Sequence, residues 1–231
     1  MKTFFISIVL LVTFAANAQE TDRLPSVERT VKVTDPFYRE DQFYVGLTHS
    51  LFTQKPAGFK QRSISIGTSF GFLRDIPLNQ KRTIAIAPGA GFAFYNFRQN
   101  FAVLNPATHD VVVDSNADKN IQNLSYVEIP LELRWRSSKV YTHKFWRIYA
   151  GIKYSYLLNS KSKYEGYYGK ATIKNSNLLS QSNLGVYMSV GFNTWNLYAY
   201  YGFKPLYDKG TANPNEPYLN MINLGLMFYI L

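Results

Sequence analysis

The chain has 231 residues and no cysteine, and its 25 Lys and Arg against 15 Asp and Glu give a formal net charge of +10. The lack of cysteine excludes a lipid-modified N-terminal cysteine, a disulfide framework and thiolate metal sites. A nucleic-acid partner is not expected, because there is no long Lys/Arg block or basic helical stripe. Aromatic residues reach 16% and charged residues only 17%, against about a quarter charged in typical soluble domains.

Residues 1–18 are predicted to be a secretory signal peptide. Lys2 supplies a basic start, Phe4–Ala15 an apolar stretch, and Ala16–Ala18 the small-x-small pattern that signal peptidase cleaves. A run of about a dozen apolar residues is too short for a helix that crosses ~30 Å of hydrocarbon. The polar residues 19–41 are predicted to be a periplasmic N-terminal segment, followed by one domain over 42–231.

From residue 42 onward, apolar side chains alternate with small or polar ones, which indicates β-strands. The two faces separate furthest in Ser125–Arg136, where the odd positions from Val127 onward are apolar and the even positions are mostly polar or charged. Eight strands are predicted: Phe43–Leu51, Ser63–Phe72, Thr83–Tyr95, Ser125–Arg136, Trp146–Tyr156, Leu184–Phe192, Leu197–Phe203 and Ile222–Ile230.

The strands approach the ~9–11 residues that a tilted membrane strand needs. Their connections alternate between short ones and longer ones such as 96–124 and 159–182, as periplasmic turns and extracellular loops do in bacterial barrels. We therefore predict an all-β fold, an eight-stranded antiparallel up-and-down transmembrane β-barrel of a bacterial outer membrane. A barrel of this size has an interior just wide enough for side chains.

Alternation also fits a soluble lipocalin-like barrel, which would turn its apolar face inward. The tryptophans favour the membrane, because Trp135, Trp146 and Trp195 fall close to predicted periplasmic turns, where an interfacial belt would place them. A second aromatic set is predicted near the outer ends of the strands: Phe94, Tyr95, Tyr156 and Tyr207. Outer-membrane lipid and lipopolysaccharide are then expected partners of the basic chain.

Charged residues on the predicted inward face form a candidate lumen charge network. Glu128, Glu132 and Arg134 share one parity, and Arg147 and Lys153 face inward on the next strand. Each needs a partner, because isolated buried charges are costly. The alternative is a functional role, as a proton relay or as a contact for a gating partner.

No cofactor, metal site or catalytic centre is predicted. His49, His109 and His143 are scattered over a strand, a long loop and a turn. The pair His109–Asp110 imitates part of a barrel-enzyme active site, but no nucleophile motif lies nearby. A non-enzymatic protein without a small-molecule substrate is expected, with a barrel enzyme as a third option.

A tyrosine-rich loop contains Tyr164, Tyr167 and Tyr168. Exposed tyrosine is enriched in contact surfaces, so this loop is a candidate binding surface. The alternative is a loop folded over the barrel mouth.

Three strings resemble PorT, a barrel protein of the type IX secretion system of the Bacteroidetes: DPFYREDQFYVG at Asp35–Gly46, FLRDIPLN at Phe72–Asn79 and YVEIPLELRWR at Tyr126–Arg136. The resemblance implies an outer-membrane component needed for secretion of cargo proteins and, in gliding species, for motility. The family has no assigned catalytic centre. The positions that match its strings are Asp35, Arg39, Glu40, Asp41, Arg74, Asp75, Glu128, Glu132 and Arg134.

Charged residues at the predicted periplasmic rim are expected to bind other secretion-machinery proteins. The predicted partner surface consists of Asp35, Arg39, Glu40, Asp41, Arg74 and Asp75. The alternative function is a surface adhesin or structural anchor that acts through the long loops 96–124 and 159–182.

Overall fold

The computed structural model describes residues 41–55, 58–61, 64–79, 81–105, 110–137, 146–192, 194–207 and 219–230. All of them belong to one compact unit, Phe37–Leu231. The predicted signal peptide, and the periplasmic segment apart from Asp41, lie outside the described residues and stay predictions. In the part of the chain that is described, no helix is long and apolar enough to cross a membrane.

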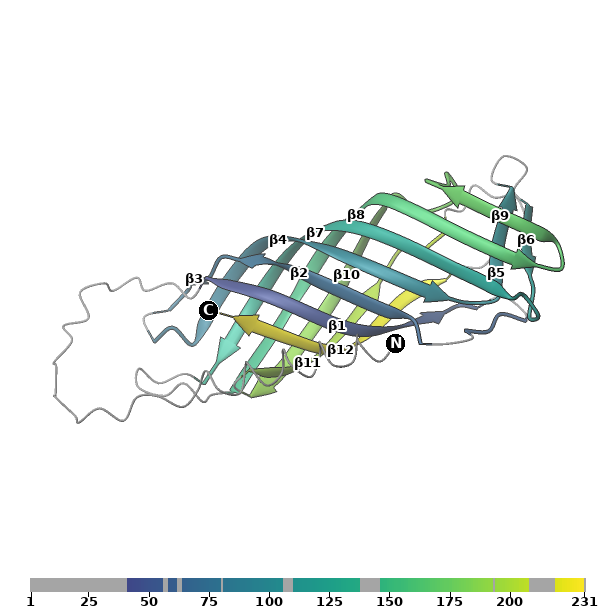
Figure 1. Cartoon of the computed structure of the whole chain (residues 1–231). Coiled ribbons are helices and arrows are strands. Elements are labelled where there is room, and N and C mark those ends of the chain that lie inside the picture. The colour runs from purple at the N-terminus through teal and green to yellow at the C-terminus, as the bar shows by residue number, and fades with distance from the viewer. Residues whose placement is uncertain are drawn as a thin grey trace, which may run out of the picture. The chain divides into compact units, whose positions relative to one another are not determined.

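Eight antiparallel strands close into a barrel (Figure 1). They are β1 Gln42–Thr53, β2 Ile66–Leu73, β4 Ile84–Arg98, β7 Lys119–Arg136, β8 Trp146–Gly166, β10 Ser182–Phe192, β11 Trp195–Gly202 and β12 Asn220–Ile230. Each strand pairs with its neighbour in chain order, and β12 pairs with β1, which leaves this ring of strands without a free edge. The predicted fold class and the prediction of eight barrel strands are confirmed.

The connections divide the barrel into two ends. We call the end with residues 74–83, 137–145 and 193–194 the short-turn end, and the end with 54–65, 99–118, 167–181 and 203–219 the long-loop end. The short strand β3, Ile76–Pro77, pairs with β4 at the short-turn end. Figure 1 shows β3 at one end of the barrel and β5, β6 and β9 at the other.

The predicted long loops are largely strand. β4, β7 and β8 run past their predicted ends, to Arg98, Lys119 and Gly166. β9, Gly169–Lys174, extends the sheet beyond β8, while β5, Phe101–Asn105, and β6, Asp110–Val113, form a separate hairpin. The sequence prediction was wrong here, because these extensions carry polar residues on both faces. Backbone pairing continues where the apolar alternation stops.

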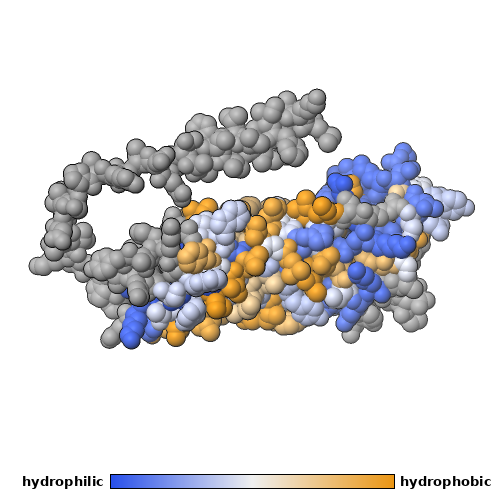
Figure 2. All heavy atoms as spheres, turned by 90° about the horizontal axis from the view of Figure 1, so that it is seen from below, coloured by the Kyte–Doolittle hydropathy of each residue, from blue (hydrophilic) through white to orange (hydrophobic). Residues whose placement is uncertain are grey.

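The outward face of the barrel is an apolar belt (Figure 2). On β7, Leu131 and Leu133 are exposed, whereas Glu132 and Arg134 between and beyond them are buried. The other strands contribute in the same way, with exposed Phe43, Val45, Leu47, Phe70, Phe92, Ile148, Ile152, Val186, Met188, Leu197 and Leu224. A continuous apolar surface around a barrel favours contact with lipid rather than water. The soluble lipocalin-like alternative is thereby disfavoured.

The three tryptophans lie on the outward face at the short-turn end. Trp135, Trp146 and Trp195 are 45%, 56% and 64% exposed. The Trp146 ring lies 5.5 Å from that of Phe192, and the Trp195 ring 5.1 Å from that of Phe228. This arrangement is the aromatic girdle expected at a membrane interface.

The four residues of the second predicted aromatic set all lie toward the long-loop end, but only two of them face outward. Phe94 and Tyr156 are exposed on the outward face, but Tyr95 and Tyr207 are buried. Tyr95 follows Phe94 on the same strand and so faces the interior. The Tyr207 hydroxyl donates to Gln122 Oε1 at 3.2 Å, which holds this loop residue inside the long-loop end.

Candidate functional site

A buried cluster of charges fills the interior at the short-turn end. The Asp75 carboxylate accepts from Arg134 Nη1 at 3.0 Å and from Arg136 Nη2 at 2.9 Å. Arg134 Nε also donates to Glu132 Oε2 at 2.8 Å. Because all four side chains are at most 2% exposed, their interactions are screened little by solvent.

Strand geometry explains why these residues meet. Glu132, Arg134 and Arg136 occupy alternate positions of β7 and therefore all point inward. Asp75 follows β2, and its backbone N–H donates to Asp41 Oδ1 at 3.2 Å. Arg136 Nε donates to the Arg82 carbonyl at 2.7 Å. The cluster is thus tied to backbone on both sides of the β2–β4 connection.

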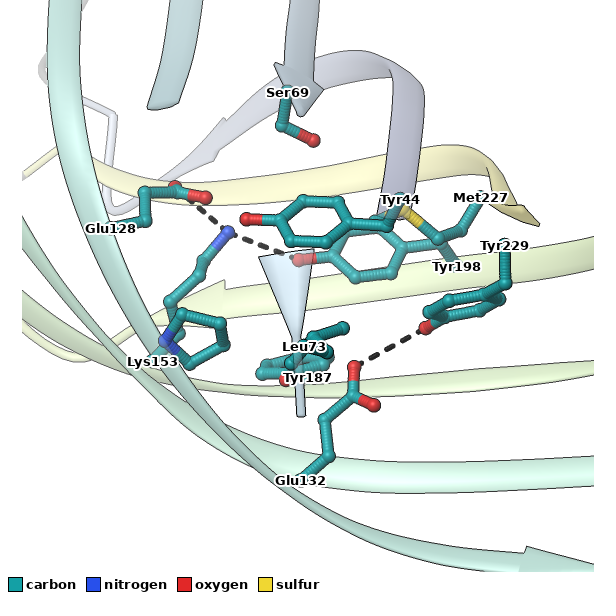
Figure 3. A pocket seen from close by; sticks show the side chains of 11 residues that line it. Tyr44, Ser69, Leu73, Glu128, Glu132, Lys153, Tyr187, Tyr198, Met227 and Tyr229 are labelled. Carbon is teal, nitrogen blue, oxygen red and sulfur yellow. Dashed lines mark hydrogen bonds and ion pairs between the residues drawn. The ribbon is translucent and has the colours of Figure 1, made fainter. Parts of the chain in front are cut away.

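A second ion pair lies deeper in the barrel (Figure 3). Lys153 Nζ is 2.9 Å from Glu128 Oε1 and donates to the Tyr198 hydroxyl at 3.2 Å. The same ammonium lies 4.5 Å from the centre of the Tyr200 ring. Both charges are buried. The lysine is therefore compensated by one carboxylate and surrounded by aromatic faces, which attract cations.

Inward-facing tyrosines line the space between the charges. The sequence analysis singled out only Tyr95 among them, and it did not place Tyr95 in the interior. The Tyr149 ring lies 5.2 Å from that of Tyr229 and 4.9 Å from the Arg134 guanidinium carbon. The Tyr229 hydroxyl donates to Glu132 Oε1 at 3.3 Å, as Figure 3 shows. The sequence contained the information needed to find these tyrosines, because each buried tyrosine alternates along its strand with the outward-facing apolar residues. The interior tyrosines are Tyr44, Tyr95, Tyr126, Tyr149, Tyr187, Tyr198, Tyr200 and Tyr229.

Two small cavities lie among the described interior side chains. A cavity beside Lys153 and Glu128 has a volume of about 10 Å³, room for about one water molecule. A second cavity of about 10 Å³ lies beside Tyr95 and Tyr200. Toward the long-loop end the interior becomes an apolar core that includes Phe52, Phe59, Phe97, Leu124 and Met221.

The predicted lumen residues all lie on the inward face. Glu128, Glu132, Arg134 and Lys153 form the ion pairs above, and Arg147 is 5% exposed on β8. Arg136 belongs to the same network, although the sequence analysis placed it only on the polar face of its strand. Its even position on β7, two residues after Arg134, was enough to place it on the inward face.

The predicted rim surface divides into separate environments. Arg74 is exposed and Asp41 is partly buried at the short-turn end. Asp75 is fully buried and its carboxylate pairs with Arg134 and Arg136, so this side chain is not part of the exposed rim. Alternation continues past the end of β2, which turns Arg74 outward and Asp75 inward. Three predicted rim residues lie outside the described residues: Asp35, Arg39 and Glu40.

Of the three histidines considered in the sequence analysis, the described structure contains His49. His49 lies on β1, with its Nδ1 3.0 Å from the Ser65 carbonyl oxygen. His109 and His143 lie outside the described residues. Among the residues that are described, no three His, Cys, Asp or Glu side chains are grouped to hold a metal ion.

The tyrosine-rich segment has one anchored and two exposed members. The Tyr164 hydroxyl donates to Asp114 Oδ2 at 2.6 Å. Burial and this hydrogen bond raise the pKa of Tyr164. Tyr167 and Tyr168 form the turn between β8 and β9 and are 89% and 56% exposed. One member is folded into the structure, and the other two remain available for contacts.

A closed eight-stranded barrel with an apolar outer face and a charged, filled interior defines a membrane β-barrel protein. Residues 17–208 match the model of the outer membrane protein beta-barrel domain, and the chain belongs to this family. The protein is therefore an outer-membrane β-barrel protein located in the bacterial outer membrane.

Two solved structures are among those to which the chain is similar. The chain is similar to Ail, the attachment invasion locus protein of Yersinia pestis, in complex with the heparin analogue sucrose octasulfate. The identity is 12%, the coverage 83% of this chain and 97% of Ail, and the TM-score 0.39. A mutant of the Rh. blastica porin is 8% identical, with coverage of 84% and 100% and a TM-score of 0.21. No curated protein matches the chain.

Proposed function

We propose that this protein is a non-enzymatic component of a type IX-like secretion machinery, which supports export of cargo proteins and, in gliding cells, motility. The proposal starts from the resemblance of three strings to PorT: Asp35–Gly46, Phe72–Asn79 and Tyr126–Arg136.

The observation that carries the proposal is that these strings meet at one end of the barrel. Asp75 of the second string pairs with Arg134 and Arg136 of the third. Asp41 of the first string accepts a hydrogen bond from the Asp75 N–H. Segments far apart in sequence thus build one structural unit. The meeting of the three PorT-like strings at one place supports a function for the short-turn end. Strings that matched PorT by chance would not be expected to contact one another in the fold.

The proposed orientation places the short-turn end in the periplasm, because short turns are periplasmic in bacterial barrels. Exposed Arg74 and partly buried Asp41 would then face periplasmic partners, together with Asp35, Arg39 and Glu40. Asp75 would act as a positioning residue, since its ion pairs hold the backbone beneath Arg74.

The filled interior supports a scaffold role rather than catalysis or solute transport. The Lys153–Glu128 pair is buried beside a cavity of about 10 Å³, which is too small for a substrate. Eight-stranded barrels are in general filled by side chains.

The test is a deletion strain complemented with the wild-type gene or with rim variants. Without the protein, cargo should accumulate in the periplasm, and the wild-type gene should restore secretion. Arg74→Glu should reduce both secretion and recovery of the machinery with the tagged barrel, because it reverses a rim charge. Lys55→Glu is the matched control, since Lys55 is exposed at the opposite end.

Outer-membrane fractionation shows whether each variant is inserted. Normal secretion in the deletion strain, with the tagged wild-type protein present in the outer membrane, would reject the secretion function. Equal effects of the two charge reversals would reject the rim as the partner surface.

A surface adhesin or structural anchor is the second candidate, favoured by the exposed Tyr167 and Tyr168. Their rings lie 5.3 Å apart at the hairpin tip, and exposed aromatic pairs are common in contact surfaces. Replacing both by Ser should abolish cell attachment and spare secretion if this function holds. Unchanged attachment would exclude the tip as an adhesive surface.

A further inference from the structure

Beyond the apolar belt, β7, β8 and β9 continue as a three-stranded extension with two different faces. Its inner face is covered, because Tyr164 packs with Ala102 and Ala117, and Leu104, Val112 and Ala171 pack around them. On β8, Ser160 and Tyr164 are buried inward, so Lys161 and Lys163 point outward.

The strand register gathers cations on this outer face. Lys161 of β8 lies directly opposite Lys174 of β9. Like charges in directly opposite positions destabilise a sheet, so this pair has a cost unless an anion lies between them. Side chains at opposite positions begin only ~5 Å apart at Cβ, close enough for both ammonium groups to bind one phosphate.

The next row adds two more cations. Lys163 lies opposite Ile121 of β7, and Ile121 lies opposite Arg98 of β4. Among the described residues, no carboxylate forms an ion pair with the basic patch, which we define as Arg98, Lys161, Lys163 and Lys174.

The row farthest from the membrane belt is different, because it contains its own anion. Glu165 lies opposite Lys119 and Lys170 and forms an ion pair with Lys170. The hydrogen bond from Lys170 lowers the pKa of Glu165. The uncompensated charge is therefore concentrated in the two rows nearest the belt.

The height of the patch matches the lipid headgroups. On β8 the belt ends with Tyr156 and Leu158, which are 38% and 53% exposed, and Lys161 follows three positions later. Three residues advance ~10 Å along a strand, or ~7 Å along the membrane normal at the ~45° tilt of a membrane strand. Headgroups occupy about 5–7 Å on each side of the hydrocarbon. The patch thus begins where headgroup phosphates lie.

We propose that the basic patch binds the phosphate groups of the lipopolysaccharide lipid anchor in the outer leaflet. This inference deepens the proposed function and rests on its orientation, in which the long-loop end faces outward. Ammonium and guanidinium groups form strong charge-assisted hydrogen bonds with phosphate. Lys161 and Lys174 would share one phosphate, and Lys163 and Arg98 would contact a neighbouring one.

The test measures binding of the full chain, refolded in detergent micelles, to purified lipid A and to its dephosphorylated form. The variant is Lys161→Gln, Lys163→Gln and Lys174→Gln together. Each lysine near a lipid surface changes binding affinity by about tenfold or less. The dissociation constant of the triple variant for lipid A should therefore rise on the order of 100-fold. The matched control is Lys55→Gln, Lys60→Gln and Lys204→Gln, which removes the same charge from exposed positions elsewhere.

The control should bind within about threefold of wild type, and dephosphorylated lipid A should bind weakly to every form. Replacement of the three patch lysines by Arg should preserve binding, which separates loss of charge from loss of folding. Equal weakening by patch and control variants, or equal binding of dephosphorylated lipid A, would overturn the proposal. So would phosphatidylglycerol vesicles that bind as tightly as lipid A.

The patch and rim hypotheses fail in different assays. The patch variant should lose lipid A binding and still secrete cargo, while Arg74→Glu should show the opposite pattern. Retained lipid A binding in the patch variant overturns this inference alone. Secretion that survives gene deletion overturns the proposed function alone.

Discussion

Asp75→Asn should weaken the barrel by removing the charge that the two buried arginines share. Asp75 lies 3.0 Å from Arg134 and 2.9 Å from Arg136, and these three side chains are at most 1% exposed. Removing one partner of a buried ion pair typically costs about 3–5 kcal/mol. Arg134 keeps Glu132 at 2.8 Å and Arg136 keeps the Arg82 carbonyl at 2.7 Å. We therefore expect a loss near the lower limit, about 3 kcal/mol in the free energy of unfolding.

Urea unfolding of the barrel in lipid vesicles measures this loss, with the fluorescence of the girdle tryptophans as the signal. A loss of ~3 kcal/mol lowers the transition midpoint by about 1 M or more, at slopes of about 1–3 kcal/mol per M. Arg74→Gln is the matched control, because it removes the adjacent exposed charge and should change stability by less than about 0.5 kcal/mol.

The double variant Asp75→Asn/Arg136→Gln tests the cause of the effect. It removes an excess buried cation, so it should recover at least ~1 kcal/mol relative to Asp75→Asn alone, as coupled neighbours do. The reasoning is refuted if Asp75→Asn and Arg74→Gln unfold at the same urea concentration. Equal stability of the single and double variants would show that charge imbalance is not the cause.

Three further outcomes are expected. Lys153→Met should cost about 3–5 kcal/mol of unfolding free energy, because it leaves Glu128 charged and buried. In urea unfolding, the double variant with Glu128→Gln should recover most of this loss. A double variant that is no more stable than Lys153→Met would contradict the ion-pair argument. Gly91→Ala should cost about 1–3 kcal/mol by overpacking, since a Cβ at this position would meet both the Tyr44 hydroxyl and the Phe70 carbonyl oxygen. Adding Tyr44→Phe should recover part of this loss in the same measurement, because it relieves the first contact and leaves the second; no recovery would show that the Tyr44 contact does not contribute. NMR of ring-labelled tyrosine should show Tyr164 titrating above pH ~10, because its pKa is raised in the folded hairpin. The tyrosine hydroxyl loses its proton at a lower pH in the unfolded hairpin than in the folded one, so the stability of the hairpin should fall as the pH rises past about 10. A Tyr164 signal that titrates at or below the ordinary tyrosine pKa would refute the inference that burial and the Asp114 hydrogen bond raise this pKa.

Strand number, strand order and side-chain direction followed from the sequence. In Ser125–Arg136, alternation assigned the odd residues to one face and the even residues to the other. The structure has Leu133 57% exposed and Arg134 0% exposed. Backbone geometry alone produces this pattern, since successive side chains of any strand point to opposite faces. The same rule was sufficient to place Tyr44 or Tyr149 in the interior.

Alternation was less informative where a strand leaves the membrane. β8 continues to Gly166, although its outward residues beyond Leu158 are polar or charged. There the outer face is polar or charged, and the inner face mixes buried serine with buried tyrosine, so no regular apolar period marks the strand. The β8–β9 hairpin and its basic outer face therefore depended on pairing that only the folded chain reveals.

The sequence by itself determined which side of the wall each strand residue faces, and tertiary structure decided which residues meet. Asp75 and Arg134 are 59 positions apart, and nothing in either string marks them as partners. Their contact depends on how far the strands are staggered when the barrel closes, because stagger and strand number together set which inward positions lie at the same height. A two-residue period is a property of one strand, whereas a contact across the interior is a property of the closed barrel.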